Sequence, residues 1–218
     1  MSAGADPGLI GVLDLQGGVQ EHLDHLRRIG VAARPVKRAT ELVGLAGLII
    51  PGGESTCLAR LLRIFDLDTA IRAAHGQGLP LWGTCAGAIL LAHENVGETP
   101  CLDLIDIAVS RNAFGSQLDS FNREVTVPAV AATPIPLTFI RAPKIVRVGA
   151  GVRVLLSLED YIAAAEDDQV LVTVFHPELT PSLAFHRYFA HKCGLSVNAA
   201  DVALDWTPHS WMRGGAGF

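Results

Sequence analysis

The sequence predicts an α/β fold: a three-layer sandwich with a mostly parallel central sheet, antiparallel strands at the sheet edge and helices on both faces. In the first half of the chain, short apolar runs alternate with helical patterns, an order typical of parallel sheets. In the second half, short apolar segments follow one another, separated by Pro, Gly or charged turns. That pattern indicates antiparallel strands added to the edge.

The composition indicates a single globular domain. The chain has 218 residues, of which 50% are hydrophobic and 18% are charged, so it can bury a sizeable core. No repeat or low-complexity linker divides it. We therefore expect one domain over residues 1–218, with a core at about residues 9–193 and a tail, 194–218, to which the sequence assigns no role.

The first expected elements are a strand and a helix. Residues 10–15 form an apolar run that ends at a Gln-Gly-Gly segment, and residues 19–29 have amphipathic helical spacing. His22 and His25 are expected on the solvated face of this helix. A second strand is expected over residues 46–50.

Ser55 is the expected N-cap of the next helix, which includes Leu58 and Leu62. The remaining elements of the first half are a helix over 67–74, a strand over 79–82 and a helix over 86–92.

The expected antiparallel strands of the second half are residues 105–109, 137–140, 145–148, 152–156, 161–165 and 170–174. A last helix is expected over residues 181–192. Its signals are Thr180 as the cap and Pro181 at the first helical position.

Charge and hydropathy exclude several classes of protein. The net charge is −5 and no basic block is present, which argues against nucleic-acid binding. No apolar run approaches the ~20 residues of a membrane-spanning helix, and no secretory signal pattern is visible. The four cysteines form no CxxC pair, so we expect reduced thiols in a cytoplasmic protein.

Cys85 is the candidate nucleophile. Residues 83–87 read Gly-Thr-Cys-Ala-Gly between an expected strand and an expected helix, which is the arrangement of a nucleophile elbow. Small neighbours permit the sharp turn, and the N-terminus of the following helix favours a thiolate and an oxyanion. The other cysteines, Cys57, Cys101 and Cys193, are expected to be buried and structural.

His176 and Glu178 are the candidate base and its orienting acid. A thiol nucleophile needs a histidine to take its proton and an acid to fix the histidine tautomer. Both lie in a His-Pro-Glu segment that follows an expected strand, and Pro177 restricts the backbone between them. A His-x-Glu pair can also bind a metal, but no convincing third ligand is present, so no metal site is predicted.

A glycine-rich loop at residues 51–55 (Pro-Gly-Gly-Glu-Ser) also follows an expected strand. Adjacent glycines let a substrate come close to the backbone, and an N–H group of this loop could donate to an oxyanion. The loop lacks the Gly-Lys-Ser/Thr of a phosphate-binding loop.

The order of these three motifs resembles that of class I (triad) glutamine amidotransferases, whose fold is flavodoxin-like. Longer blocks closely resemble the glutaminase subunits of pyridoxal 5′-phosphate synthases. They are residues 11–23, 48–56, 83–92, 111–121, 139–143 and 175–189.

The resemblance implies a role for each site residue. It makes Cys85, His176 and Glu178 the nucleophile, base and acid, and it places oxyanion donors at Gly53 and Ala86. It implies glutamine contacts at Gly53, Glu54, Ser55, Arg111, Ile140 and Arg141, and a partner contact at Gln16. The arginines have a physical rationale as well, because an amino-acid substrate brings a carboxylate.

The resemblance also implies an activity and a partner. The chain would hydrolyse L-glutamine to glutamate and ammonia without a cofactor. It would pass the ammonia to a synthase (lyase) subunit, in a large hetero-oligomer that builds pyridoxal 5′-phosphate. Asp14, Gly18 and Cys57 depart from the residues usual in the family.

Three alternatives stay open: a glutaminase subunit that serves another synthase, a cysteine hydrolase or peptidase, and a catalytically silent regulatory subunit. The blocks at residues 111–115 and 139–143 argue against the first, and the His-Pro-Glu spacing argues against the second. An intact set of Cys85, His176 and Glu178 argues against the third.

Overall fold

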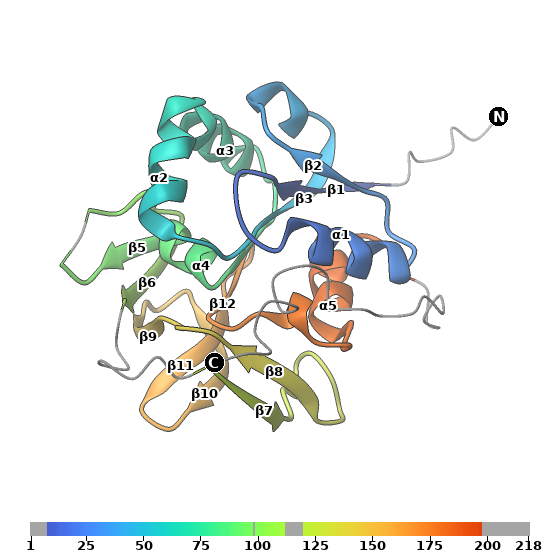
Figure 1. Ribbon diagram of the computed structural model, residues 1–218, viewed down its shortest axis with the longest axis vertical. Coiled ribbons are helices and arrows are strands. Elements are labelled where there is room, and N and C mark those ends of the chain that lie inside the picture. The colour runs from blue at the N-terminus through green and yellow to red at the C-terminus, as the bar shows by residue number, and fades with distance from the viewer. Residues whose placement is uncertain (1–7, 98, 112–119, 198–218) are drawn as a thin grey trace, which may run out of the picture.

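A computed structural model describes residues 8–97, 99–111 and 120–197. Figure 1 shows a central sheet with helices on both of its faces. Within the described residues, the main sheet has ten strands. They are β1 (Leu9–Leu13), β2 (Ala33–Val36), β3 (Leu45–Ile50), β4 (Leu81–Thr84), β5 (Ala92–Asn95), β6 (Ile105–Ser110), β9 (Lys144–Val148), β10 (Arg153–Leu158), β11 (Tyr161–Glu166) and β12 (Val170–Thr173).

A separate two-stranded sheet pairs β7 (Phe121–Val125) with β8 (Ile135–Phe139). The helices are α1 (Val19–Arg28), α2 (Ser55–Ile64), α3 (Leu67–Gly76), α4 (Ala86–Leu91) and α5 (Ala184–Lys192), with 3-10 turns η1 (Ala39–Leu42) and η2 (Pro177–Leu179).

The strand order confirms the predicted fold class. The main sheet runs β2-β1-β3-β4-β12-β11-β9-β6-β5, and β10 pairs with β11. Neighbours from β2 to β12 are parallel, whereas β11 and β9 introduce antiparallel pairs. The carboxyl ends of β3, β4 and β12 therefore meet at one edge of the sheet, which is where ligands bind in open α/β sheets.

Two strands lie elsewhere than predicted. The segment expected as an antiparallel edge strand at residues 170–174 is β12, which lies inside the sheet, parallel to β4 and antiparallel to β11. All of its residues are buried, as expected of a strand covered on both faces. The segment at residues 137–140 belongs to β8, which pairs with β7 away from the main sheet. The sequence reading also missed β2, β5, β7 and η1.

Two helix starts differ from the prediction. Glu54, and not Ser55, caps α2: its carboxylate accepts from the N–H groups of Thr56 and Cys57 at 3.0 and 2.7 Å. Helix α5 begins at Ala184 rather than at residue 181. The hydroxyl of Thr180 donates to the Pro177 carbonyl, and local bonds of this kind compete with helix formation.

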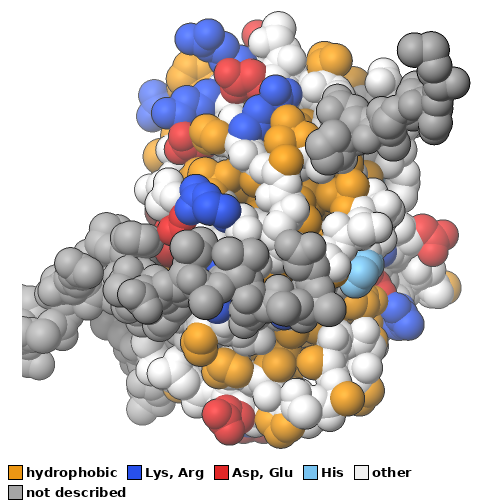
Figure 2. All heavy atoms as spheres, turned by 90° about the vertical axis from the view of Figure 1, so that its right-hand side faces the viewer, with side chains coloured by type: hydrophobic (Ala, Val, Ile, Leu, Met, Phe, Trp, Pro, Cys, Tyr) orange, Lys and Arg blue, Asp and Glu red, His pale blue; other side chains and the backbone are white. Residues whose placement is uncertain are grey.

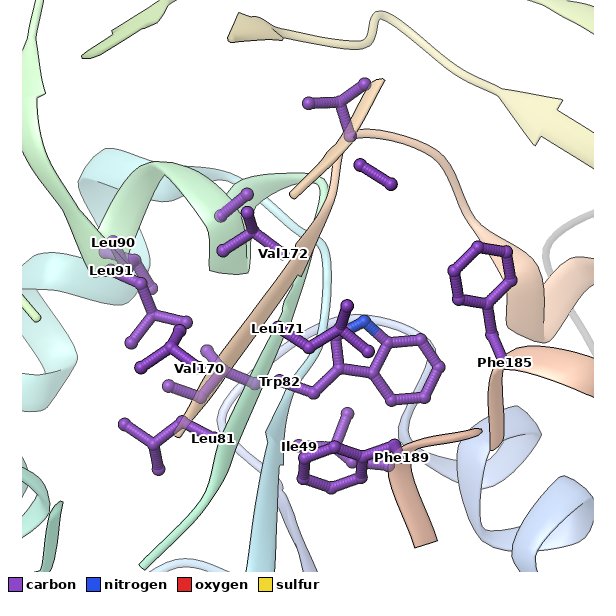
Figure 3. Close-up of a cluster of buried hydrophobic side chains, with 14 of the residues drawn as sticks. Ile49, Leu81, Trp82, Leu90, Leu91, Val170, Leu171, Val172, Phe185 and Phe189 are labelled. Atoms are coloured by element: carbon purple, nitrogen blue, oxygen red, sulfur yellow. The ribbon is translucent and has the colours of Figure 1, made fainter. Parts of the chain in front are cut away.

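The helices form two layers. Helices α1 and α5 lie together on one face of the sheet, and α2, α3 and α4 cover the other (Figure 1). Between the first layer and the sheet, the fully buried Trp82 of β4 packs against Phe185 and Phe189 of α5 (Figure 3). This core fixes the strand that leads to Cys85.

Helix α1 corrects another prediction. His22 and His25 were expected on a solvated face, but they are 0% and 1% exposed. The rings of His22 and His25 pack against His186 of α5, with centroids 5.1 and 4.5 Å away. The helix buries this polar stripe because α5 and Trp82 cover it.

On the face shown in Figure 2, acidic and basic side chains lie beside one another, with hydrophobic side chains between them. That face therefore carries mixed charge rather than a block of one sign. Among the described residues, no helix is long and apolar enough to cross a membrane.

Candidate active site

Cys85 lies at the turn between β4 and α4. Its backbone has φ 49° and ψ −105°, a conformation that L-residues rarely adopt, and its N–H donates to the Thr173 carbonyl at 2.8 Å. The flanking glycines are required by space. A Cβ at Gly83 would lie 2.5 Å from the backbone of Gly87, and one at Gly87 would lie 2.0 Å from the Ile50 carbonyl oxygen. The elbow predicted from the motif therefore has its expected strain and crowding.

His176 and Glu178 follow β12. The register pairs Thr173 with Thr84, so the segment after β12 emerges beside Cys85. His176 Nδ1 lies 2.8 Å from Glu178 Oε1, and the His176 imidazole interacts electrostatically with Cys85. All three residues are buried, with exposures of 8%, 8% and 1% for Cys85, His176 and Glu178. The structure thus brings the three predicted residues together.

The electrostatics of this trio favour a strong base. Burial alone would lower the pKa of His176, but the charges of Glu178 and Cys85, and the hydrogen bond to Glu178, raise that pKa well above its ordinary value. Burial opposes the charge of Glu178, yet His176 and His22 hold the pKa of that carboxyl at about 2. Glu178 is therefore ionised throughout the neutral range.

The glycine-rich loop follows β3 and lies beside the trio. Ile50 pairs with Gly83 in the sheet, which sets the loop against the elbow. A Cβ at Gly52 would lie 2.5 Å from His176 Cε1 and 3.3 Å from Cys85 Cβ. Gly52 is therefore the glycine that admits the imidazole. The sequence reading named only Gly53 as functional, although Gly52 was in the same motif.

Gln16 contacts this loop directly. Its Oε1 accepts a hydrogen bond from the N–H of Glu54 at 3.0 Å, next to Gly53, which has φ +149°. Gly17 and Gly18 follow it: a Cβ at Gly17 would lie 1.9 Å from the Gly52 carbonyl oxygen, and one at Gly18 would lie 3.1 Å from Glu178. The segment before α1 is thus packed against both the loop and the acid.

Ala86, the second predicted oxyanion donor, is the first residue of α4 and is buried.

The predicted substrate contacts fall into two groups. Arg111 follows β6, and its guanidinium donates to Thr56 at 3.2 Å and to Glu54 at 3.4 Å. Ser55 and Arg111 both line a cavity of about 180 Å³ between α2 and α4. This group therefore lies together at the N-terminus of α2.

Ile140 and Arg141 form the second group. They follow β8, whose Thr138 carbonyl accepts from the His176 N–H at 2.8 Å. Arg141 is exposed and has φ +44°.

The four cysteines are free thiols. Cys57 was expected to be buried, but it is exposed on the first turn of α2. Cys101 is buried and Cys193 is half-buried, and burial raises the pKa of both thiols. In the described ranges, no group of three or more His, Cys, Asp or Glu residues could hold a metal ion.

His22 is the functional candidate that the sequence reading placed wrongly. Its Nε2 lies 3.6 Å from Glu178 Oε2, beneath the trio. His22 lies three residues after the start of α1 and belongs to no recognisable sequence motif. Only the three-dimensional structure shows that it lies beside Glu178. Asp14, one of the residues that depart from those usual in the family, forms an ion pair with Lys37 at 3.2 Å.

The comparisons with known proteins agree on a family. Residues 12–195 match the model of the SNO glutamine amidotransferase family. The "pyridoxal 5′-phosphate synthase subunit PdxT" of Syntrophus aciditrophicus (strain SB) is 60% identical over 94% of this chain and 93% of its own length. The protein of the same name from Clostridium kluyveri is 47% identical over 84% of this chain and 98% of its own.

A solved structure described as a glutamine amidotransferase superposes with a TM-score of 0.81 at 43% identity. It covers 86% of this chain and 100% of its own.

Proposed function

This chain belongs to the SNO glutamine amidotransferase family, and on that premise we propose that it is the glutaminase subunit of a pyridoxal 5′-phosphate synthase. It hydrolyses L-glutamine to glutamate and ammonia with Cys85 as nucleophile, His176 as base and Glu178 as the acid that orients the base. The identity to two proteins named as subunits of this synthase supports the choice of pathway.

One observation carries the catalytic proposal: a strained cysteine at a strand-to-helix turn interacts with a buried histidine, whose Nδ1 is bound by a buried carboxylate. The raised pKa of His176 makes it a strong proton acceptor from the thiol. Glu178 fixes the ring with a proton on Nδ1, so that Nε2 faces Cys85.

The reaction proceeds in two halves. His176 takes the thiol proton as the sulfur of Cys85 attacks the side-chain amide carbon of glutamine. The tetrahedral oxyanion accepts hydrogen bonds from the N–H groups of Gly53 and Ala86. His176 then returns the proton to the leaving nitrogen and ammonia departs. Water, deprotonated by His176, hydrolyses the glutamyl thioester to glutamate and restores the thiol.

The ends of the substrate are held away from the reacting amide. Arg111, with Glu54 and Ser55 beside it, binds the amino-acid end of glutamine at the N-terminus of α2. Ile140 and Arg141 complete the site from the loop after β8. Because Arg141 is exposed in this structure, we propose that it turns toward the substrate carboxylate when glutamine is present.

The ammonia passes to a synthase (lyase) subunit. Gln16 belongs to the surface that meets this partner, and its bond to the Glu54 N–H connects that surface with the oxyanion loop. The glutaminase chain needs no cofactor for this chemistry. Pyridoxal 5′-phosphate is a product of the complex.

The test is glutamate release by the purified chain, alone and with the synthase subunit of a close relative. Cys85→Ala should lower the rate by at least about 10³-fold. Cys57→Ala, the same change at an exposed thiol on the first turn of α2, should leave the rate unchanged. Turnover that survives Cys85→Ala contradicts the nucleophile, and an inactive mixture of the two subunits supports the silent-subunit alternative.

A further inference from the structure

Three histidines lie buried beneath the proposed triad. His22 and His25 come from α1 and His186 from α5, and none is more than 1% exposed. Buried histidines need hydrogen-bond partners, because an unpaired polar group in the interior costs free energy. The proposed mechanism uses none of the three.

His22 connects this cluster to the triad. One oxygen of Glu178, Oε1, is bound to His176 Nδ1. Its other oxygen, Oε2, is buried and has no hydrogen-bond partner among the described residues. His22 Nε2 lies 3.6 Å from Oε2, which is longer than a hydrogen bond but within reach of one after a small shift.

The positions of the protons on His22 and His186 follow from the hydrogen-bond partners of His186. His22 Nδ1 and His186 Nε2 are 2.9 Å apart, so one of them donates to the other. His186 Nδ1 is buried without a partner in the described part of the chain. If His22 donated, His186 would carry its proton on this orphaned Nδ1, and the lone pair of His22 Nε2 would face a carboxylate.

The opposite arrangement leaves no buried donor unpaired. His186 Nε2–H donates to His22 Nδ1, and His22 Nε2–H then points to Glu178 Oε2. In this arrangement His186 Nδ1 is an unprotonated acceptor without a partner. No N–H group of the two rings is then left unpaired in the interior.

We infer that His22 is a positioning residue of the glutaminase site: held by His186 in the tautomer that carries its proton on Nε2, it presents that N–H to the free oxygen of Glu178. The carboxylate is thereby fixed with its other oxygen on His176. This inference deepens the proposed function, since it takes Glu178 as the acid of the triad.

The surroundings keep His22 neutral, as this role requires. Burial lowers the pKa of His22 to about 4, although Glu178 opposes that shift. The groups that face the cluster are Glu178 and His176 on one side, with His25, His186 and Arg28 on the other. Thr84 Oγ1 also lies 3.5 Å from His22 Nε2.

The direct test is the tautomer of His22 in the unsubstituted chain. Two-bond ¹H–¹⁵N spectra of ¹⁵N-histidine-labelled protein at pH 7 distinguish a protonated ring nitrogen from a bare one. The expected result is a proton on Nε2 and none on Nδ1 in both His22 and His186, each assigned by its substitution. A His22 proton on Nδ1, or a doubly protonated His22, overturns the inference whether or not the chain turns over glutamine.

A second test measures the consequence for His176 and needs no glutamine. The rate of Cys85 alkylation by iodoacetamide is followed against pH in Cys57→Ala protein, which removes the exposed thiol. Gln at position 22 places an amide N–H near Nε2, whereas Asn ends near Nδ1 and cannot reach Glu178. We expect H22N to slow alkylation at neutral pH about tenfold and to shift its pH profile, while H22Q stays within about threefold of the parent.

His25→Gln is the matched control. His25 is equally buried in the cluster, but its ring nitrogens lie 2.9 Å from the carbonyl oxygens of Glu21 and Thr180 and not against the carboxylate. It should lower thermal stability and leave the alkylation profile unchanged. Equal losses in H22N, H22Q and His25→Gln would assign His22 to packing alone and would overturn the positioning role.

Discussion

The space around Cys85 is set by glycines. Gly83 and Gly87 let the elbow form, and Gly52 leaves room for the imidazole of His176. At each of them a Cβ would come within 2.5 Å of a neighbouring atom, and packed interiors do not yield easily at such distances. The absence of a side chain at these three glycines therefore determines where Cys85 and His176 lie.

Gly52→Ala tests whether the site requires a residue without a side chain beside His176. The added methyl group would displace His176 and break its alignment with Cys85, so we expect glutaminase activity to fall at least about 100-fold, given the cost of small misplacements in a reacting site. Glutamate release in the presence of the synthase subunit measures it, with circular dichroism to show that the fold is kept.

Gly76→Ala is the control for that experiment. Gly76 ends α3, and a Cβ there would meet no atom within 4 Å. It should retain full activity and gain up to about 1 kcal/mol of stability. Full activity in Gly52→Ala would show that the site tolerates the methyl group and would refute the steric argument.

At the scale of elements, the contact of α1 with α5 makes stability depend on pH. Burial lowers the pKa of His22 to about 4 and that of His186 well below its ordinary value. Unfolded histidines take up protons near pH 6.5. The unfolded state therefore binds more protons between about pH 6.5 and 4, and the folded state loses stability as the pH falls through that window.

The expected loss from His22 alone is about 3 kcal/mol, because the pKa moves from 6.5 to about 4. Urea unfolding at pH 7.0, 5.5 and 4.5 measures it. His176, with its raised pKa, adds stability as the pH falls toward 6.5; this contribution is complete below pH 6.5 and does not oppose the trend there. H22Q should show a smaller loss on acidification; equal slopes in the two proteins would contradict the assignment.

The elements also show where sequence patterns succeed. The strand-to-helix turn at Cys85 and the approach of His176 to it could be predicted, because parallel strands place their carboxyl ends at one edge. The cap of α2 could not: Ser55 is the preferred residue type, yet the longer Glu54 reaches two N–H groups. Likewise, β12 was expected at the edge, since a short apolar strand has the same pattern at either position.

Helix α1 shows a different limit. Its apolar spacing predicted the helix, but burial of His22 and His25 depends on α5, more than 150 residues later in the chain. Gly52 and Gly53 were indistinguishable in sequence, and only the packing of His176 tells them apart. Partners far apart in the chain decide both cases, so no local pattern carries them.

For the whole molecule, one sheet joins both helix layers and the site. The later strands β12, β11 and β9 lie in one block of this sheet, between the earlier strands β4 and β6. We therefore expect a single cooperative unfolding transition, with equal calorimetric and van't Hoff enthalpies. Two resolved transitions would contradict the single-domain prediction.

The measurement that tests the central claim most directly is labelling by a glutamine-like electrophile, with the modified cysteine identified by peptide mass spectrometry. We predict a single adduct on Cys85, prevented by excess glutamine and absent in Cys85→Ala, although Cys57 is the exposed thiol. Iodoacetamide, which lacks the α-amino and α-carboxylate groups of glutamine, should label Cys57 as well as Cys85 in the same protein. An adduct on Cys57, or on Cys85 without protection by glutamine, would contradict the proposed site.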